Sequence, residues 1–349
     1  MGVDPLLRVE NLVTAFETDT GRIRAVDGVS FEIEPGETVC LVGESGSGKT
    51  VTSESITRLI ATPPGEITAG TIWFDGRELT ELAEAELRAL RGDRIAHVFQ
   101  NPQETLNPVY PVGRQIAETL RIHDSGGSRP INDQVIDLLD RVGIPEPTDR
   151  VDDYPHQLSG GMKQRVVIAM ALAGQPDLLI ADEPTTALDV TIQAQILRLL
   201  EELQEELGMA ILFVTHDLGV VAEIADRVIV LYAGKVMERA AVHELFEKPA
   251  HPYTRALLAC LPGRGGETAP IGGEIPPPAD PPEGCRFHPR CPHAIGACRD
   301  GDQPPLGDVE SGGTDHRASC VFYQSGYETD RLETPMGERT EPTGPEGER

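Results

Sequence analysis

Short apolar runs alternate with longer amphipathic segments over residues 6–250. Five runs rich in Val, Ile and Leu, at 38–42, 95–99, 178–181, 211–215 and 228–232, predict buried strands. Between them, 49–60, 162–173 and 192–207 have the length and periodicity of helices. Strands that alternate with helices are typical of an α/β domain, so the pattern predicts one domain with a layered sheet over 6–250.

The alternation stops after residue 250. Residues 263–284 are dense in Gly and Pro, which predicts a linker or loops. They lie within a segment, 251–324, that we expect to form a small C-terminal module rich in cysteine. From about residue 325 the tail is polar, acidic and rich in Pro and Gly. Such a composition buries too little apolar area to order a chain, so we predict a disordered tail over 325–349.

The chain is strongly acidic. It has 57 acidic and 30 basic residues and a formal net charge of −27, which repels phosphate backbones, so nucleic acid is not an expected partner. Only four basic residues are lysines, and acidic residues are spread over the whole length. Dispersed carboxylates keep a surface hydrated where salt screens charge, so this pattern favours a halophilic protein from a high-salt cytoplasm.

No segment has the pattern of an export signal or a membrane span. Asp4, Arg8 and Glu10 stand where a signal peptide would have an apolar stretch. The longest apolar run, 166–174, is far shorter than the ~20 residues that cross a bilayer. We therefore expect a cytosolic protein that associates with a membrane only through a partner. Its six cysteines are expected to be reduced thiols or metal ligands.

A phosphate-binding loop follows the predicted strand 38–42 and opens a helix. Its residues fit the pattern G-x-x-x-x-G-K-[ST] and are Gly43, Glu44, Ser45, Gly46, Ser47, Gly48, Lys49 and Thr50. The glycines let backbone N–H groups turn toward an anion, Lys49 reaches the β and γ phosphates of ATP, and Thr50 binds Mg²⁺. The alternative is a glycine-rich turn between a strand and a helix that binds nothing.

Two carboxylates, Asp182 and Glu183, follow the predicted strand 178–181 at the edge of the sheet that faces the phosphates. Behind a phosphate loop, Asp182 is expected to coordinate Mg²⁺. Glu183 is expected to polarise the attacking water as a general base, because that role needs a carboxylate near the metal but not on it. Without the phosphate loop, a strand that ends in Asp-Glu would be read as structural.

The segment Leu-Ser-Gly-Gly-Met at 158–162 precedes the predicted helix 162–173. Ser159 suits a helix cap, and Gly160 and Gly161 allow a close backbone approach. Together with the phosphate loop, this segment resembles the signature motif of ABC ATPases, and the resemblance extends in family order through Gln100, the turn Ala-Leu-Asp at 187–189 and His216. It implies a P-loop NTPase core with an antiparallel β subdomain and a helical subdomain at about 101–172.

The resemblance also implies roles for single residues. Residues 159–161 of one subunit would reach the γ-phosphate held by residues 43–50 of the other, in a head-to-tail dimer of two ATPase subunits. Gln100 would touch Mg²⁺ and the attacking water, and His216 would sense the γ-phosphate. Phe16 fits the aromatic residue that stacks on adenine in this family. A lone Gln, His or Phe at the end of a strand is otherwise structural.

Three segments, 99–108, 182–195 and 251–258, resemble the ATPases of dipeptide, oligopeptide and nickel importers in particular. That group places two ATPases under two transmembrane permease subunits fed by an extracellular substrate-binding protein, at the cytoplasmic face of the cell membrane. Peptide is the expected cargo, with nickel, glutathione and sugar oligomers as alternatives. A soluble ABC ATPase acting on nucleic acid or ribosomes is the competing class. The acidic charge and the lack of a long insertion or a second ATPase domain argue against it.

Four cysteines lie in sequence that has no apolar core of its own. Cys285, Cys291, Cys298 and Cys320 have the spacing C-x5-C-x6-C-x21-C. Soft thiolates suit an iron–sulfur cluster or zinc, and the absence of a C-x2-C pair disfavours a zinc ribbon. The segment resembles the C-terminal extension of oligopeptide-transporter ATPases, which can hold a [4Fe–4S] cluster. We expect such a cluster, with Zn²⁺ or free thiols as alternatives and His288 and His293 as substitute ligands.

Overall fold

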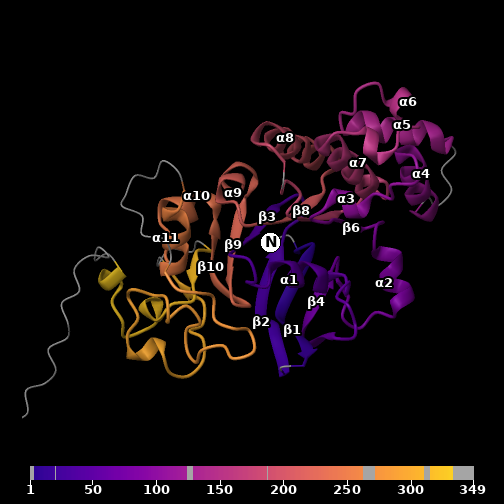
Figure 1. Ribbon diagram of the computed structural model, residues 1–349. Helices are drawn as coiled ribbons and strands as arrows, with labels where there is room; N and C mark the ends of the chain where they lie inside the picture. The colour runs from indigo at the N-terminus through magenta and orange to yellow at the C-terminus, as the bar shows by residue number, and fades with distance from the viewer. Residues whose placement is uncertain are drawn as a thin grey trace, which may run out of the picture.

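The computed structural model (Figure 1) describes residues 4–19, 21–123, 129–186, 188–261, 272–309 and 315–332. Its largest sheet has the strand order β11-β12-β10-β9-β3-β8-β7-β6. The five strands from β9 to β6 are parallel and nearly wholly buried: β3 Thr38–Val42, β6 Ile95–Val98, β7 Leu178–Asp182, β8 Ala210–Thr215 and β9 Arg227–Tyr232. Parallel strands covered on both faces have continuous apolar sequences, and all five predicted strands are therefore confirmed.

Three predicted helices are also present, with changed ends. Helix α8 is Val190–Leu207, and α7 is Gly160–Leu172, two residues earlier than predicted because Ser159 caps it. Helix α1 is Lys49–Ile56 and ends four residues before the predicted position. Arg58 has φ +52°, a left-handed conformation that cannot continue a right-handed helix. Helix α9, Leu218–Ile224, follows β8.

A second, antiparallel sheet has the order β2-β1-β4-β5. Its strands are β1 Leu7–Thr18, β2 Gly21–Ile33, β4 Gly65–Phe74 and β5 Arg77–Glu78. Apolar side chains of this sheet share one buried cluster with side chains of β3, β7 and β8. Helix α1 contacts strands of both sheets. The phosphate-binding loop that precedes α1 is thus fixed where the two sheets meet.

The chain between β6 and β7 is helical in the residues described. It contains helix α7 and, before it, α3 Pro102–Thr105, α4 Val112–His123, α5 Ile131–Arg141, α6 Pro147–Arg150 and the 3-10 turn η1 Pro155–Gln157. Helix α2 itself is Glu84–Leu90 and precedes β6. Figure 1 shows α4 to α7 gathered at one end of the molecule. The bounds of a helical subdomain at 101 and 172 stay a prediction.

The C-terminal region, 272–332, is not a separate module, contrary to our expectation. Its strands β11 Gly307–Asp308 and β12 Arg317–Ala318 extend the large sheet beside β10 Lys235–Ala241. Most of its apolar side chains and its four cysteines belong to the main buried cluster or pack against it, whereas Leu306 packs against the cluster of the antiparallel sheet. The region follows helices α10 Val242–Glu247 and α11 Pro252–Ala259 and contains three 3-10 turns, η2 Gly296–Cys298, η3 Val321–Tyr323 and η4 Thr329–Leu332.

The prediction of disorder from residue 325 is wrong for 325–332. Turn η4 lies there, and Leu332 is buried in the main cluster, with its carbonyl oxygen accepting a hydrogen bond from Arg255. Residues 263–271 of the predicted linker and 333–349 of the tail lie outside the described residues.

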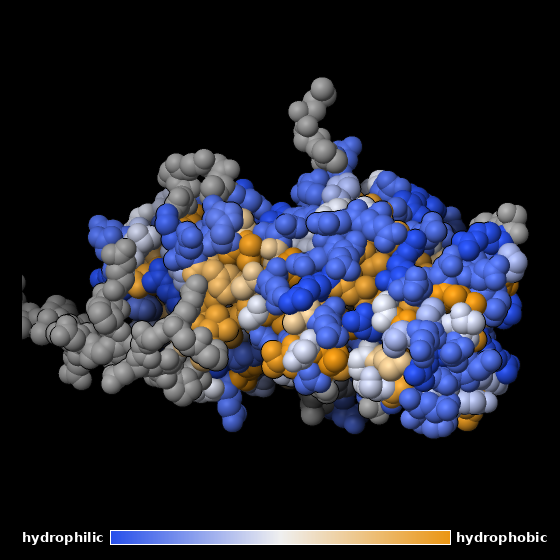
Figure 2. Space-filling view, turned by 90° about the horizontal axis from the view of Figure 1, so that it is seen from above, coloured by the Kyte–Doolittle hydropathy of each residue, from blue (hydrophilic) through white to orange (hydrophobic). Residues whose placement is uncertain are grey.

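Hydrophilic residues cover most of the face seen in Figure 2, and apolar residues gather in patches between them. Within the described residues, no helix has both the length and the apolar character that a membrane crossing needs.

Candidate functional site

The phosphate-binding loop connects β3 to α1 and passes close to neighbouring backbone. Gly43 has φ +155° and Gly48 has φ +101°. A Cβ at Gly43 would lie 2.2 Å from the carbonyl oxygen of Leu231, and one at Gly48 would lie 2.4 Å from that of Ala25. Both positions therefore require glycine on steric grounds. Gly46 has φ +79°, and its added Cβ would meet no described atom within 4 Å.

Lys49 curls back over this loop. Its Nζ donates to the carbonyl oxygens of Gly43, at 2.9 Å, and Glu44, at 3.1 Å. Burial lowers the pKa of the ammonium, while the carboxylates of Glu183, Asp182 and Glu44 act in the opposite direction. A buried cation beside a turn of backbone N–H groups is suited to binding a polyphosphate. The side chain of Ser47 is also buried, and its hydroxyl has no hydrogen-bond partner among the described residues.

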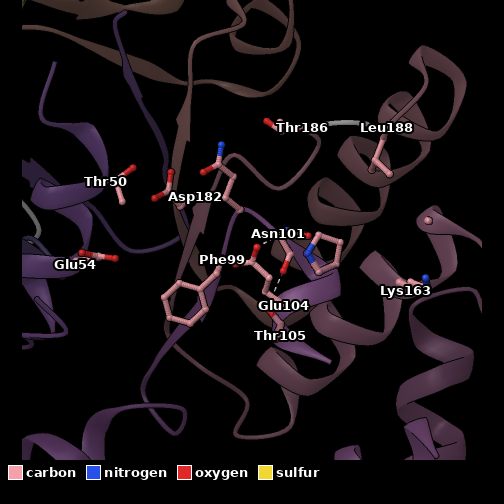
Figure 3. Close-up of a pocket in the computed structure, with 13 residues that line it drawn as sticks. Thr50, Glu54, Phe99, Asn101, Glu104, Thr105, Lys163, Asp182, Thr186 and Leu188 are labelled. Carbon is pink, nitrogen blue, oxygen red and sulfur yellow. Dashed lines mark hydrogen bonds between the residues drawn. The ribbon is translucent and has the colours of Figure 1, made fainter. Parts of the chain in front are cut away.

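Asp182 ends β7 and faces the start of α1. Its pKa is raised because the side chain is buried, although a hydrogen bond with Thr50 lowers it. Oδ1 is buried and has no hydrogen-bond partner among the described residues. Figure 3 shows Thr50 and Asp182 extending from α1 and β7 toward the same space. A buried carboxylate oxygen without a donor, next to a hydroxyl, fits a hard cation such as Mg²⁺, which takes one or two protein oxygens together with substrate phosphates.

Glu183 is the centre of a hydrogen-bonded network. Its Oε1 lies 2.8 Å from Nδ1 of His216, and its Oε2 accepts from Nε2 of Gln100 at 2.8 Å and from Oγ1 of Thr186 at 3.0 Å. Burial raises the pKa of this carboxyl, but the hydrogen bonds with His216 and Thr186 outweigh it, and the net pKa is lowered. The group is therefore ionised at neutral pH and able to accept a proton.

The network brings together residues predicted from three separate segments. Gln100, Glu183 and His216 follow β6, β7 and β8, and the carboxyl ends of neighbouring parallel strands lie at one edge of a sheet. Sequence reasoning missed Thr186. The signal for it was a hydroxyl residue three positions after the general-base candidate.

A cavity of about 890 Å³ extends from Thr50 and Asp182 to the signature segment at the start of α7. It is lined by Thr50, Asp182 and Gln100 on one side and by Gly160 and Lys163 on the other. Figure 3 shows Lys163 on its helix at some remove from Thr50 and Asp182. The cavity is thus open between the phosphate-binding loop and α7.

The signature residues shape the start of α7. Oγ of Ser159 accepts a hydrogen bond from the backbone N–H of Met162 at 3.3 Å, so the predicted cap is confirmed. Ser159 and Gly160 are exposed, whereas Gly161 is buried. A Cβ at Gly161 would lie 2.6 Å from the side chain of Ile192. Glycine at that position is therefore also required for α7 to pack on α8. Ala187 of the predicted turn at 187–189 lies outside the described residues.

Phe16 lies on β1 and is half-buried. It is opposite Gly65 of β4, where an added Cβ would lie 2.7 Å from its ring. Packing over a glycine on the adjacent strand is a structural role that the sequence did not reveal. The stacking of Phe16 on adenine stays a prediction.

The four cysteines of the C-terminal region are mostly buried thiols. Cys285, Cys298 and Cys320 are buried, and Cys291 is half-buried. Burial, together with the neighbouring thiols, raises the pKa of Cys285 to about 11 and those of Cys291 and Cys320 to about 12. Among the described residues, no group of three or more His, Cys, Asp or Glu side chains is arranged to hold a metal ion. The predicted cluster or zinc site therefore has no support from the geometry.

Comparisons with known proteins agree with this geometry. Residues 26–186 match the family model described as "ABC transporter", and 237–298 match "Oligopeptide/dipeptide transporter, C-terminal region". The chain is 50% identical over 338 residues to a Brucella ovis protein named "Putative peptide import ATP-binding protein", covering 93% of this chain and 99% of that one. It is 49% identical over 321 residues to a Sinorhizobium fredii protein named "Probable peptide ABC transporter ATP-binding protein", covering 91% and 95% of the two chains.

Solved structures are similar as well. The dimeric post-hydrolysis state of the ATP-binding cassette MJ0796, bound to ADP and Pi, has a TM-score of 0.61 and 31% identity, with 68% of this chain and 98% of that chain covered. A structure of cbiO1 from Clostridium perfringens, described as part of an ABC transporter complex, has a TM-score of 0.61 and 30% identity, with 70% and 92% covered.

Proposed function

This chain belongs to the ABC transporter family as an ATP-hydrolysing subunit, and from that premise we propose that it powers the import of dipeptides or oligopeptides. The observation that carries the proposal is the match of 237–298 to the C-terminal region of oligopeptide and dipeptide transporters. That segment follows the residues that match the ABC transporter model, and the model it matches is described for oligopeptide and dipeptide transporters in particular. Relatives with half of their residues identical are named for peptide import.

The site residues take the following roles in the proposal. Backbone N–H groups of residues 43–50 and the ammonium of Lys49 bind the phosphates of ATP. Thr50, Asp182 and Gln100 would hold Mg²⁺, and a bound Mg²⁺ would supply positive charge beside the phosphates. Phe16 stacks on adenine.

Glu183 accepts the proton of the attacking water. This assignment is supported by the ionised carboxylate and its position beside Asp182. His216 and Gln100 orient the carboxylate through the hydrogen bonds described above. His216 also takes the role of γ-phosphate sensor in this proposal, since its side chain is 57% exposed and in contact with Glu183.

We propose a head-to-tail dimer with a second ABC ATPase subunit, under two transmembrane permeases at the cytoplasmic face of the cell membrane. An extracellular substrate-binding protein would deliver the cargo. The exposure of Ser159 and Gly160 at the start of α7 supports the dimer, because a helix N-terminus at the surface can bind the γ-phosphate held by the partner.

Transport assays in proteoliposomes test the cargo. The chain, its second ATPase and the two permeases would be reconstituted with the binding protein encoded beside them, and uptake of labelled dipeptides and oligopeptides measured with ATP inside. ATP-dependent peptide uptake is expected. Uptake of nickel, glutathione or a sugar oligomer without peptide uptake would replace the proposed cargo. ATP hydrolysis that no cargo or permease stimulates would favour an ABC ATPase outside transport.

We also propose that the four cysteines bind a metal centre, a [4Fe–4S] cluster or else Zn²⁺. Support comes from the donor chemistry: neighbouring thiols contribute to the raised pKa of Cys285, Cys291 and Cys320, and these three thiols accept backbone N–H hydrogen bonds. The side chains would have to move to close around a metal, and binding would displace their protons. Anaerobic purification followed by iron, sulfide and zinc analysis is the test, and a preparation that contains none of these would leave free thiols.

We also propose a high-salt cytoplasm, on the basis of the net charge of −27, the scarcity of lysine and the spread of acidic residues along the chain. If it holds, the melting temperature should rise as KCl is increased from ~0.1 M to ~2 M, because salt screens the repulsion between surface carboxylates. A falling melting temperature would contradict it.

A further inference from the structure

An arginine of the C-terminal region reaches the phosphate-binding loop. Nη1 of Arg290 donates to Oε2 of Glu44 at 2.9 Å, and Nη2 donates to Oε1 at 3.2 Å. The Arg290 side chain is only 5% exposed, and Glu44 is 25% exposed. This is a two-pronged ion pair shielded from water, a geometry in which both the charge and the planar guanidinium matter.

The surroundings hold Arg290 in place. Its guanidinium lies 5.6 Å from the ring centre of Tyr232 and 5.9 Å from that of Phe287, and it donates to the Tyr232 hydroxyl at 3.3 Å. Tyr232 ends β9, and Phe287 belongs to the C-terminal region and packs against Tyr232 edge to face. The rings of Tyr232 and Phe287 therefore hold the Arg290 guanidinium in place through cation–π contacts.

Glu44 is the second residue of the loop and is held at other points too. Its backbone N–H donates to the hydroxyl of Tyr253 on α11 at 3.0 Å, and its carbonyl oxygen accepts from Lys49. The negative charge of its carboxylate acts to raise the pKa of the Lys49 ammonium, which binds phosphate in the proposed function. A carboxylate this close to a polyphosphate repels it unless a cation neutralises the carboxylate.

A second arginine, four residues earlier, supports the other end of the loop. Arg286 donates to the carbonyl oxygen of Ala233 and to the carboxylate of Asp27. The next residue, Gly234, donates its N–H to the carbonyl oxygen of Ser47 at 2.8 Å. Arg286 thus holds the turn that contacts the loop at Ser47, while Arg290 holds the loop at Glu44. Each arginine is the sequence neighbour of a cysteine, Cys285 or Cys291.

We propose that Arg290 is a positioning residue for ATP binding: through its ion pair with Glu44, the C-terminal region neutralises the Glu44 carboxylate and keeps its charge away from the phosphates. The inference rests on the proposed role of residues 43–50 in binding ATP. It assigns the C-terminal region a function in the nucleotide site of its own chain, in addition to any metal it binds.

Calorimetric titration of the full-length chain with MgATP, together with ATPase kinetics, tests the proposal. Arg290→Ala should weaken ATP binding and raise KM by about tenfold, with kcat changed less, because the unpaired Glu44 charge repels the phosphates equally in the ground state and the transition state. Arg290→Lys should recover only part of the affinity, because a lysine keeps the charge but not the fork.

Glu44→Gln in the Arg290→Ala background separates positioning from folding. Removing the repelling charge should restore most of the ATP affinity, although the ion pair is still absent. A double variant that binds ATP as weakly as Arg290→Ala would show that Arg290 only supports the fold, and would overturn the proposal. Unchanged affinity in Arg290→Ala would overturn it too.

Arg299→Ala is the matched control, since Arg299 is an exposed arginine of the same region. The affinity of this variant for MgATP should equal that of the unaltered chain. Failure of the unaltered chain to bind MgATP would refute the proposed function itself. Normal binding that is insensitive to Arg290 would refute only this inference.

Discussion

Replacing Glu183 with glutamine isolates the charge at the centre of the catalytic network. The substitution keeps the length and shape of the side chain, so the packing at the end of β7 should be preserved. It removes a carboxylate that accepts hydrogen bonds from Gln100 and Thr186 and lies 2.8 Å from Nδ1 of His216. An amide oxygen can still accept from Gln100 and Thr186, but the amide nitrogen cannot accept from His216, so that bond is lost when Nδ1 carries a proton.

The expected loss can be estimated from these contacts. A neutral hydrogen bond lost at a partly exposed site costs about 0.5–1.5 kcal/mol. Loss of the general base costs about 10²–10⁴-fold in rate, which is about 3–5 kcal/mol of barrier. Loss of the base therefore dominates, and Glu183→Gln should lower kcat by about a thousandfold. ATP binding should be retained, because Lys49, Thr50 and Asp182 are unchanged.

Single-turnover hydrolysis and MgATP titration measure the two effects separately, and size-exclusion chromatography with ATP should show a trapped dimer. Glu247→Gln is the control, since it removes an exposed carboxylate at the end of α10. Because His216 contacts the same carboxylate, adding His216→Ala to Glu183→Gln should slow the reaction little further. Hydrolysis by Glu183→Gln within about twofold of the unaltered rate would refute the assignment, given the expected size of the effect.

Three further predictions follow from the packing. Gly48→Ala should abolish ATP binding in a titration, because its Cβ would lie 2.4 Å from a carbonyl oxygen, whereas Gly46→Ala should weaken it less; equal losses would contradict the steric argument. His251 is buried, which lowers its pKa from 6.5 to about 3. Its contribution to stability is full above pH 6.5 and should fall by about 2 kcal/mol by pH 5, so urea unfolding of His251→Asn should depend less on pH, and an unchanged pH dependence would count against it. Glu238 is fully buried and bonded to His316 and to two backbone N–H groups. Glu238→Ala should lower the free energy of unfolding by about 3–5 kcal/mol, and a loss below about 1 kcal/mol would rule out a paired buried charge.

Many residues of the candidate site could be predicted because the patterns that identify them lie within short segments of the chain. The phosphate-binding loop needs particular residues at fixed spacing between a strand and a helix, and those residues are consecutive in the chain. Gln100, Glu183 and His216 lie far apart in sequence, but each follows a run of apolar residues. Parallel strands place their carboxyl ends at one edge, and the resemblance to ABC ATPases singled out Gln100 and His216 among the residues at that edge.

The C-terminal region shows where such reasoning stops. Its sequence, rich in Gly and Pro, has no helical or strand period, and we expected a small module that binds a metal centre through four cysteines. The structure instead packs Phe287 and the cysteines into the main core and adds β12 to the large sheet. Local pattern does not show this, because two-residue strands and irregular loops gain their stability from the surface they cover.

The sequence alone therefore predicted the chemistry of the phosphate-binding loop, the residues that follow the parallel strands and the family of the protein. Only the tertiary structure revealed Thr186 beside Glu183, the buried Glu238 and the ion pair between Arg290 and Glu44, which are 246 positions apart. Spacing and periodicity specify the secondary structure that a segment forms and the loops that follow it. Contacts between distant segments depend on which surfaces pack together, and that is decided by the burial of the whole chain at once.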